Sequence, residues 1–172
     1  DKTLQHAYTT SWGVSTRLIG GVIMTHGDDS GLILPPKVAP YQVVIVPIPR
    51  GNWQETVLPK AREIRDALTA AGVRVMLDDR DAYTPGWKYA EWEMRGVPVR
   101  LEIGPKDIEK AQVMLARRDT REKMSAPMET VVPFVTDLLE AIQKNLFERA
   151  LKFRDEHTTS ASEWAEFQKL ME

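Results

Sequence analysis

The stretch Tyr41-Gln-Val-Val-Ile-Val-Pro-Ile48 decides the fold of this chain. A continuous run of β-branched residues is typical of a strand buried on both faces. The segment that follows has apolar residues at helical spacing, and Gly72 stands where a helix C-cap is expected. The spaced positions are Val57, Ala61, Ile64, Leu68 and Ala71. We therefore expect a buried strand that leads directly into an amphipathic helix.

Strand and helix patterns continue to alternate toward the C-terminus. Strands are predicted at residues 73–77, 97–103 and 112–117, with a weaker strand at 123–126, and helices at 87–95, 129–156 and 162–171. Gly104-Pro105 is interpreted as a turn. In residues 97–103 apolar and polar residues alternate, which is typical of a half-exposed strand. This order predicts an α/β fold with a mixed sheet layered with helices.

The first 36 residues have a different pattern. Three prolines in residues 34–40 favour extended chain, so we interpret this stretch as a linker to the main domain. Before it, residues 8–16 fit a strand and residues 18–24 fit the start of a helix. Elements this short cannot bury a core alone, so we expect them to belong to a larger sheet. Because the chain starts at Asp1 without an initiator Met, we expect a fragment of a longer protein.

The composition excludes several classes of protein. Of the 172 residues, 42% are hydrophobic and 28% are charged, as in a soluble globular protein. No apolar run approaches the roughly 20 residues of a transmembrane helix. The absence of cysteine excludes disulfides, thiolate zinc sites and cysteine nucleophiles within this chain. The net charge of −2 gives no global basic field, so any nucleic-acid binding must come from a local surface.

Metal-binding and nucleotide-binding motifs are weak in this sequence. The three histidines, His6, His26 and His157, are far apart and have no metal-ligand spacing. Acids in turns and at strand ends could bind a cation, although such acids are more often solvated. They are Asp28-Asp29, Asp78-Asp79 and Asp81. Gly20-Gly21 lacks the lysine of a phosphate-binding loop. We therefore predict no metal site.

Two segments have a more unusual composition. In residues 9–24, small hydroxyl residues, Trp12, Gly13 and Arg17 meet at a predicted strand-to-helix junction. A lone arginine amid apolar sequence needs an anionic partner, which is either an internal carboxylate or an anionic ligand.

In residues 77–96, aromatic and charged residues interleave. Helical spacing places Trp87, Ala90 and Met94 on one face, expected to be core. Lys88, Glu91 and Arg95 share another face, expected to be exposed. Donors and acceptors beside stackable rings suit recognition of unpaired RNA bases, and a merely solvated face is the alternative.

Together these segments resemble the prolyl-tRNA synthetases, which are class II aminoacyl-tRNA synthetases. Residues 10–28 are similar to motif 3 of that family, residues 31–47 to the passage into its anticodon-binding domain, and short motifs within residues 77–107 to the pattern of that domain. The resemblance implies an anticodon-binding α/β domain with a five-stranded mixed sheet and three helices, preceded by a fragment of the catalytic antiparallel sheet. The implied divisions are 1–36 for the end of the catalytic domain, 37–136 for the anticodon-binding core, and 137–172 for C-terminal helices leading toward a further domain.

The resemblance also implies roles in catalysis for the N-terminal segment. Arg17, as the motif 3 arginine, would contact ATP and stabilise its phosphates during attack by the proline carboxylate. Ser15 and Thr16 would supply further ATP contacts. Trp12 and Gly13 would line the pocket for proline and its adenylate.

For the anticodon, the resemblance implies reading of two guanines by Arg80, Lys88, Glu91 and Lys106. Arginine and lysine suit guanine O6 and N7, and a glutamate suits the N1 and N2 donors.

The parent enzyme implied by the resemblance is a proline–tRNA ligase that uses ATP with Mg²⁺ to make prolyl-adenylate and then transfers proline to tRNA(Pro). The resemblance further implies that this enzyme is a homodimer in the cytoplasm, without a membrane partner. Motifs 1 and 2 are absent here, so the isolated chain is predicted to be inactive. Zinc is expected only in a C-terminal domain beyond this chain, held by cysteines. Two alternatives stay open. One is a non-catalytic RNA-binding or accessory module with an anticodon-like domain. The other, a small-molecule α/β enzyme, has no nucleophile or cofactor loop in its favour.

Overall fold

The computed structural model describes residues 3–171, and its centre is a single five-stranded sheet. The strands are β1 (Val43–Pro47), β2 (Val75–Leu77), β3 (Val99–Ile103), β4 (Gln112–Arg117) and β5 (Lys123–Pro127), in the spatial order β2-β1-β3-β4-β5. Strand β1 pairs in parallel with both β2 and β3, whereas β3 with β4 and β4 with β5 are antiparallel. The predicted five-stranded mixed sheet is confirmed.

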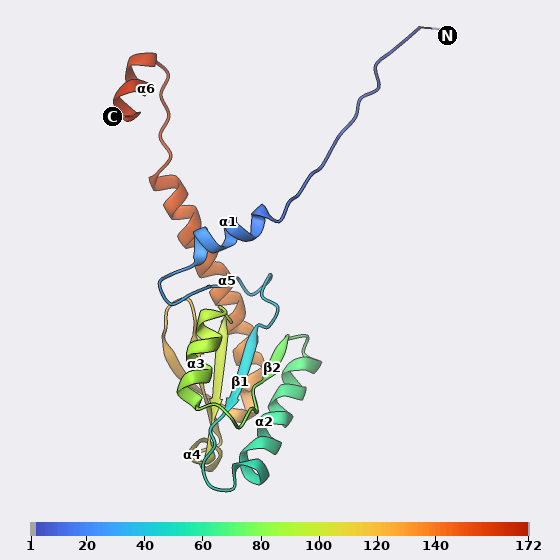
Figure 1. The fold of residues 1–172 in the computed structure, drawn as a ribbon, viewed down its shortest axis with the longest axis vertical. Coiled ribbons are helices and arrows are strands. Elements are labelled where there is room, and N and C mark those ends of the chain that lie inside the picture. Colours follow the sequence, from blue (N-terminus) through green and yellow to red (C-terminus); the bar gives the residue numbers. More distant parts are fainter. Residues whose placement is uncertain (1–2, 172) are drawn as a thin grey trace.

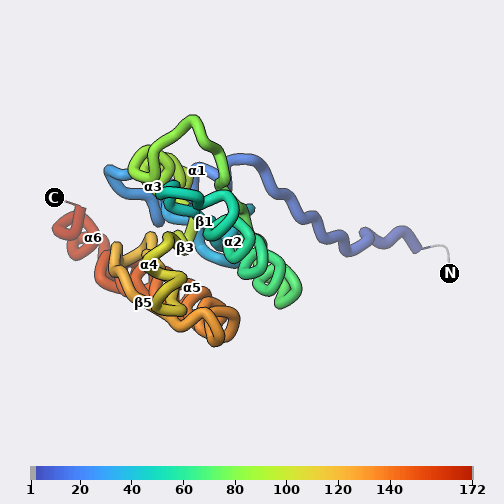
Figure 2. Tube along the Cα trace, turned by 90° about the horizontal axis from the view of Figure 1, so that it is seen from below, coloured from blue at the N-terminus to red at the C-terminus, as the bar shows by residue number. Residues whose placement is uncertain are grey.

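Helices cover both faces of the sheet, as Figures 1 and 2 show. They are α1 (Arg17–His26), α2 (Trp53–Ala70), α3 (Pro85–Met94), α4 (Pro105–Glu109), the 3₁₀ turn η1 (Met128–Thr130), α5 (Val131–Glu156) and α6 (Trp164–Met171). The short helix α4 stands where a turn was predicted at Gly104-Pro105. Proline suits the first turn of a helix, and the amide of Gly104 donates to Asp107 Oδ2 at 2.8 Å, which closes that turn.

The main hydrophobic core lies between one face of the sheet and helices α2 and α5. Alternate residues of the strands, such as Ile45 and Leu101, point to this face and are fully buried. Helix α2 adds the spaced residues that the sequence predicted, including Val57 and Leu68. Helix α5 extends the core to Leu146, so it stabilises the sheet over several turns.

The opposite face of the sheet is only partly covered. Helix α3 packs on β1 through a small core of Val44, Val46, Trp92 and Val97. Every residue of β1 is therefore buried, but β3 alternates, with Arg100 and Glu102 half-buried on the side of α3. Helix α3 does not reach across β4 and β5, and the polar side chain of Lys123 on β5 is exposed beside it.

The segment before β1 is tied to the end of α3. Leu32 and Leu34 donate their amides to the carbonyls of Met94 and Gly96, at 2.9 and 3.1 Å. The close approach needs glycine, because a Cβ on Gly96 would lie 2.6 Å from Leu32 Cβ. The proline-rich stretch is also packed, since Arg74 donates to the Pro36 carbonyl at 2.8 Å.

Residues 3–16 run away from the domain without strand pairing (Figure 1). Between residues 3 and 42 the only β-contact described is the isolated bridge of Asp28 with Gly31. The expected fragment of an antiparallel sheet is therefore not formed here, because a strand needs a paired neighbour and this stretch has none alongside it. The predicted helix after it is present as α1, which lies against α5.

Helix α5 runs without a break through the division predicted between residues 136 and 137. Its later turns leave the sheet and lead to α6, as Figure 1 shows. None of the described helices is long and apolar enough to cross a membrane.

Candidate functional site

A groove of about 190 Å³ opens on the partly covered face of the sheet, between the C-terminal end of α3 and strands β3 to β5. We name it the α3 groove. It is lined by Val44, Trp92, Glu93, Val97, Arg100, Ala116, Arg117, Arg118, Arg121 and Lys123. Its floor is apolar and its walls are charged. A volume below the roughly 300–1,000 Å³ of sites for drug-sized ligands suits one small planar ring system.

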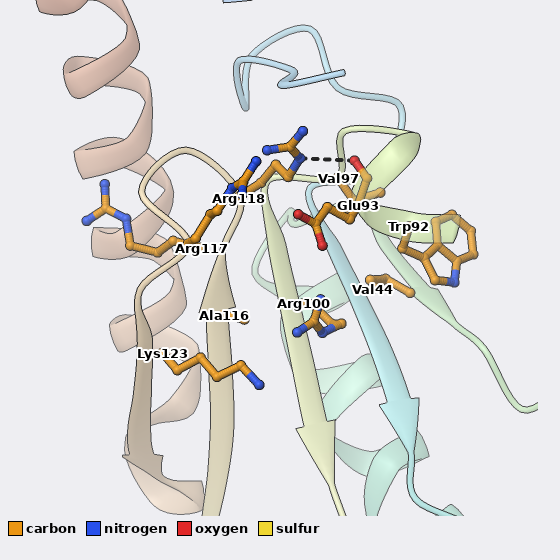
Figure 3. Close-up of a pocket in the computed structure, with 10 residues that line it drawn as sticks. Val44, Trp92, Glu93, Val97, Arg100, Ala116, Arg117, Arg118 and Lys123 are labelled. Atoms are coloured by element: carbon orange, nitrogen blue, oxygen red, sulfur yellow. Dashed lines mark hydrogen bonds between the residues drawn. The ribbon is translucent and has the colours of Figure 1, made fainter. Parts of the chain in front are cut away.

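Three charged side chains from different elements converge on the α3 groove. Figure 3 shows the side chains of Glu93, Arg100 and Lys123 directed toward the same space from α3, β3 and β5. The carboxylate of Glu93 forms no ion pair or hydrogen bond with any side chain among residues 3–171. An unpaired acceptor and nearby cationic donors together favour a polar ligand that carries both acceptors and donors.

The guanidinium of Arg100 is held in place from two sides. It pairs with Glu102 at 2.9 Å and lies 4.1 Å from the centre of the Tyr89 ring. Burial raises the pKa of the Tyr89 phenol, and the charge of Glu102 adds to this, so the ring stays neutral. Lys123 approaches Glu102 at 3.7 Å. The carboxylate of Glu102 thus positions both Arg100 and Lys123.

The rim of the α3 groove is an ion-pair cluster that reaches the N-terminal segment. Arg118 is buried and donates to the Glu93 carbonyl at 3.0 Å and to Asp28 at 2.9 and 2.6 Å. Arg121 contacts the same carboxylate at 3.1 Å. The hydrogen bond from Arg118 lowers the pKa of Asp28 despite some desolvation, so Asp28 is charged at neutral pH.

Arg117 lines the groove but its guanidinium points away from it, toward α5 (Figure 3). It pairs with Asp119 at 2.7 Å, and Asn145 of α5 donates to the same carboxylate. Arg117 therefore fastens the β4–β5 turn to α5 and is not free to hold a ligand.

A second charged cluster lies along α3, on the side that carries Lys88 and Trp92, and we name it the Asp78 network. Asp78 follows β2 directly and is 1% exposed. Its carboxylate accepts from Arg80 at 2.8 and 2.7 Å and from Trp92 Nε1 at 2.7 Å, while Lys88 Nζ donates to its carbonyl at 3.0 Å. Burial disfavours its charge, but the hydrogen bonds from Arg80 and Trp92 outweigh this and lower the pKa of Asp78 to about 2.

The predicted faces of α3 are wrong except at Arg95, whose side chain is exposed as expected. Lys88, expected to be exposed, is 2% exposed, and the Glu91 side chain is 10% exposed because it pairs with both Arg80 and Arg95. Trp87 and Met94, expected in the core, are largely exposed. The buried carboxylate of Asp78 determines this rotation of the helix, since it needs a cation and an N–H donor at positions 88 and 92.

The structure brings together only part of the predicted anticodon set. Arg80, Lys88 and Glu91 belong to one connected network, in which Lys88 is inaccessible from outside. Lys106 is exposed on α4, at the carboxyl end of β3, and does not line the α3 groove.

The sequence reasoning missed Glu93, Arg100 and Lys123. They lie on three separate elements, and no spacing along the chain connects them. One signal was present, which is the alternation of Arg100 and Glu102 with apolar residues in a strand interpreted as half-exposed.

The residues predicted for catalysis lie in the N-terminal segment, far from both clusters. Trp12 is 95% exposed, and nothing lies within 4 Å of a Cβ built on Gly13. Ser15 and Thr16 precede α1, and Arg17 is its exposed first residue. These residues offer one cation and two hydroxyls without enclosing walls, so alone they do not form a nucleotide site.

Metal-binding geometry is also lacking in the described part of the chain. No three histidine or acidic side chains gather within residues 3–171 in a way that could hold a metal ion.

Comparison with known proteins gives a consistent set of relatives. Residues 42–138, more than half of the chain, match the family described as "Anticodon binding domain". The chain is 55% identical over 171 residues to proline–tRNA ligase 2 of Clostridioides difficile (strain 630), covering 98% of this chain and 35% of that protein. It is 50% identical over 169 residues to the chloroplastic/mitochondrial proline–tRNA ligase of Arabidopsis thaliana, covering 94% and 31%. The chain thus spans about a third of the length of the curated relatives it matches.

Proposed function

The chain belongs to the anticodon binding domain family, and from this premise we propose that it is the anticodon-reading part of a proline–tRNA ligase. The names of its relatives support this function, as does their similarity over nearly the whole chain. That similarity includes the N-terminal segment, which an accessory module without catalysis would not need. The alternative of a non-catalytic module is therefore not favoured.

The proposal extends to the parent enzyme. It would activate proline with ATP and Mg²⁺ and transfer it to tRNA(Pro), working as a homodimer in the cytoplasm. Within this chain, Ser15, Thr16 and Arg17 would complete an ATP site, and Trp12 and Gly13 a proline pocket, whose remaining walls come from other parts of the ligase. These residues alone do not enclose ATP.

The free carboxylate of Glu93, facing the fixed guanidinium of Arg100 across the α3 groove, carries the proposal. Guanine presents two acceptors, O6 and N7, on one edge and donors at N1 and N2 on another. A guanidinium or ammonium suits the acceptors, and a carboxylate suits the donors. Arg100 and Lys123 would therefore contact O6 and N7, and Glu93 would accept from N1 and N2.

The Asp78 network takes a supporting role in this proposal. Lys88 and Asp78 lie outside the groove lining, and with Trp92, which lines the groove, they fix the rotation of α3, on which Glu93 depends. Arg80, Glu91 and Lys106, whose side chains are all more exposed than that of Lys88, remain proposed contacts to the RNA. An anticodon reader of this kind needs a rigid support, because a shifted carboxylate would no longer distinguish guanine from other bases.

The test is a binding titration of the full chain with tRNA(Pro) and with the same tRNA in which both anticodon guanines are replaced, at two salt concentrations. We expect tRNA(Pro) to bind at least tenfold more tightly, with a preference that persists as salt weakens both complexes. Lys144→Ala serves as the control, since this exposed lysine lies on α5, behind the sheet. Equal binding of the two RNAs would leave only attraction to the phosphate backbone and contradict the proposal.

A further inference from the structure

A stacked aromatic pair, Tyr83 and Trp87, stands at the surface beside the first turn of α3. Their ring centres are 4.0 Å apart and their planes differ by 15°. The two residues are 40% and 45% exposed. This pair is outside the α3 groove and has no part in the buried core of the domain.

The two rings are held in a fixed position although they lie at the surface. Thr84 caps α3, and its hydroxyl accepts from the Trp87 amide at 3.4 Å, which fixes the first turn below the ring. The guanidinium of Arg80 lies 5.0 and 5.5 Å from the two ring centres and is itself anchored by Asp78. The rings thus have a fixed orientation before any partner arrives, which lowers the entropic cost of binding.

We propose that Tyr83 and Trp87 form a stacking platform for a second unpaired base of the same RNA, outside the guanines read in the α3 groove. An exposed aromatic face accepts any base, because every base has a π-face. Arg80 beside it is paired with Asp78 and Glu91, but its Nη1 is free of partners among residues 3–171 and would donate to the phosphate of that nucleotide. The platform would add affinity without adding selectivity for one base.

The spacing of the two sites fits one RNA loop. Trp87 and Glu93 are six residues apart on α3, which is on the order of 9 Å along the helix axis. Bases follow each other at about 3.4 Å along a stacked strand, so the axial rise alone corresponds to about two or three nucleotides, and the rotation of about 120° between the two side chains lengthens the path between the sites. Each site takes a residue from α3, so both lie on the face of the sheet that α3 covers. The inference rests on the proposed function, since it takes the ligand to be an anticodon loop.

The test uses the full chain and a proline anticodon stem-loop in which each loop nucleotide in turn is made abasic. We expect Trp87→Ala to weaken binding of the intact stem-loop roughly tenfold, with the preference for guanine unchanged. One loop position other than the two guanines should lose affinity when abasic in the wild type but not in Trp87→Ala. Trp87→Phe should restore most of the affinity, and Tyr83→Ala should act in the same direction as Trp87→Ala.

The matched control is Trp164→Ala, because Trp164 is also exposed and stacks on Phe167 at 5.4 Å, but on α6. It should leave binding unchanged. The platform is contradicted if Trp87→Ala, with an unaltered melting temperature, binds like the wild type. It is also contradicted if every abasic substitution weakens binding by Trp87→Ala as much as it weakens binding by the wild type. If the wild type shows no guanine preference but one abasic position still depends on Trp87, the proposed anticodon reading fails and the platform stands.

Discussion

Two faces of α3 hold charged residues in opposite states of pairing. On the face of Lys88 and Trp92, Asp78 is buried and receives hydrogen bonds from both residues and from Arg80, through its carboxylate or its carbonyl. On the neighbouring face, Glu93 points to the α3 groove with a carboxylate that no described side chain satisfies. A buried carboxylate whose oxygens already accept hydrogen bonds cannot bind a ligand, whereas an accessible carboxylate without partners can. The difference separates the group that positions the helix from the group that reads the ligand.

The largest effect on stability should come from removing the fully hydrogen-bonded carboxylate of Asp78. We expect Asp78→Ala to lower the free energy of unfolding by about 3–5 kcal/mol, because it leaves the buried Lys88 without its carboxylate. Chemical denaturation monitored by circular dichroism measures this. Asp79→Ala is the matched control, since Asp79 is half-exposed and pairs with Arg62 only at 3.9 Å; it should cost less than about 1 kcal/mol. Equal losses would contradict the distinction between the two acids.

Acid should remove the same stabilisation without a mutation. The pKa of Asp78 is about 2 in the folded chain and 3.8 ordinarily, so its contribution is complete above pH 4 and is lost as the pH falls toward 2. The shift corresponds to about 2 kcal/mol. Unfolding of the wild type and of Asp78→Asn should therefore converge by about this amount between pH 5 and pH 2. A constant difference would show that Asp78 is not the titrating group.

A smaller effect is expected at the rim of the groove. Arg118→Ala should lower the free energy of unfolding by about 1–2 kcal/mol, because it leaves the Glu93 carbonyl without this donor and weakens the hold on Asp28. Hydrogen exchange should become faster at Leu32 and Leu34, whose amides tie the N-terminal segment to the end of α3. Arg121→Ala, a change at an exposed partner of the same carboxylate, should have less effect on both measurements.

The smallest effect should come from the N-terminal segment. Trp12→Ala should change the free energy of unfolding by less than about 0.5 kcal/mol, since this ring is 95% exposed and packs on nothing in the domain. Trp92, buried between α3 and β1, serves as the contrast, and its change to Ala should cost about 3–5 kcal/mol. A large loss at Trp12 would show that the segment packs in solution.

Much of the fold could be predicted from local patterns. The run from Tyr41 to Ile48 and the alternation in residues 97–103 identified β1 and β3, since each follows from which faces of a strand are buried. Helix α4 was missed because Gly104-Pro105 suits both a turn and a helix start, and the decisive contact is the side chain of Asp107.

The candidate site was harder to predict for a physical reason. Hydrophobicity assigns Trp87 to the core and Lys88 to the surface, but the buried carboxylate of Asp78 reverses that order. This partnership depends on tertiary structure, because strand β2 delivers Asp78 to the side of α3. The groove residues likewise meet only after β3 and β5 are assembled in one sheet.

The most direct test of the central claim is a double-mutant cycle between Glu93→Gln and a guanine-to-inosine change at each anticodon guanine in turn, measured as the Kd for the full chain. Inosine lacks only the N2 amino group, from which the Glu93 carboxylate is proposed to accept a hydrogen bond. We expect inosine at one position to cost the wild type about 1–3 kcal/mol and Glu93→Gln clearly less, because the glutamine has one uncharged acceptor oxygen in place of a carboxylate, with Glu63→Gln on the far side of the sheet behaving like the wild type. Equal inosine penalties in the wild type and in Glu93→Gln at both positions would contradict reading of guanine by the α3 groove.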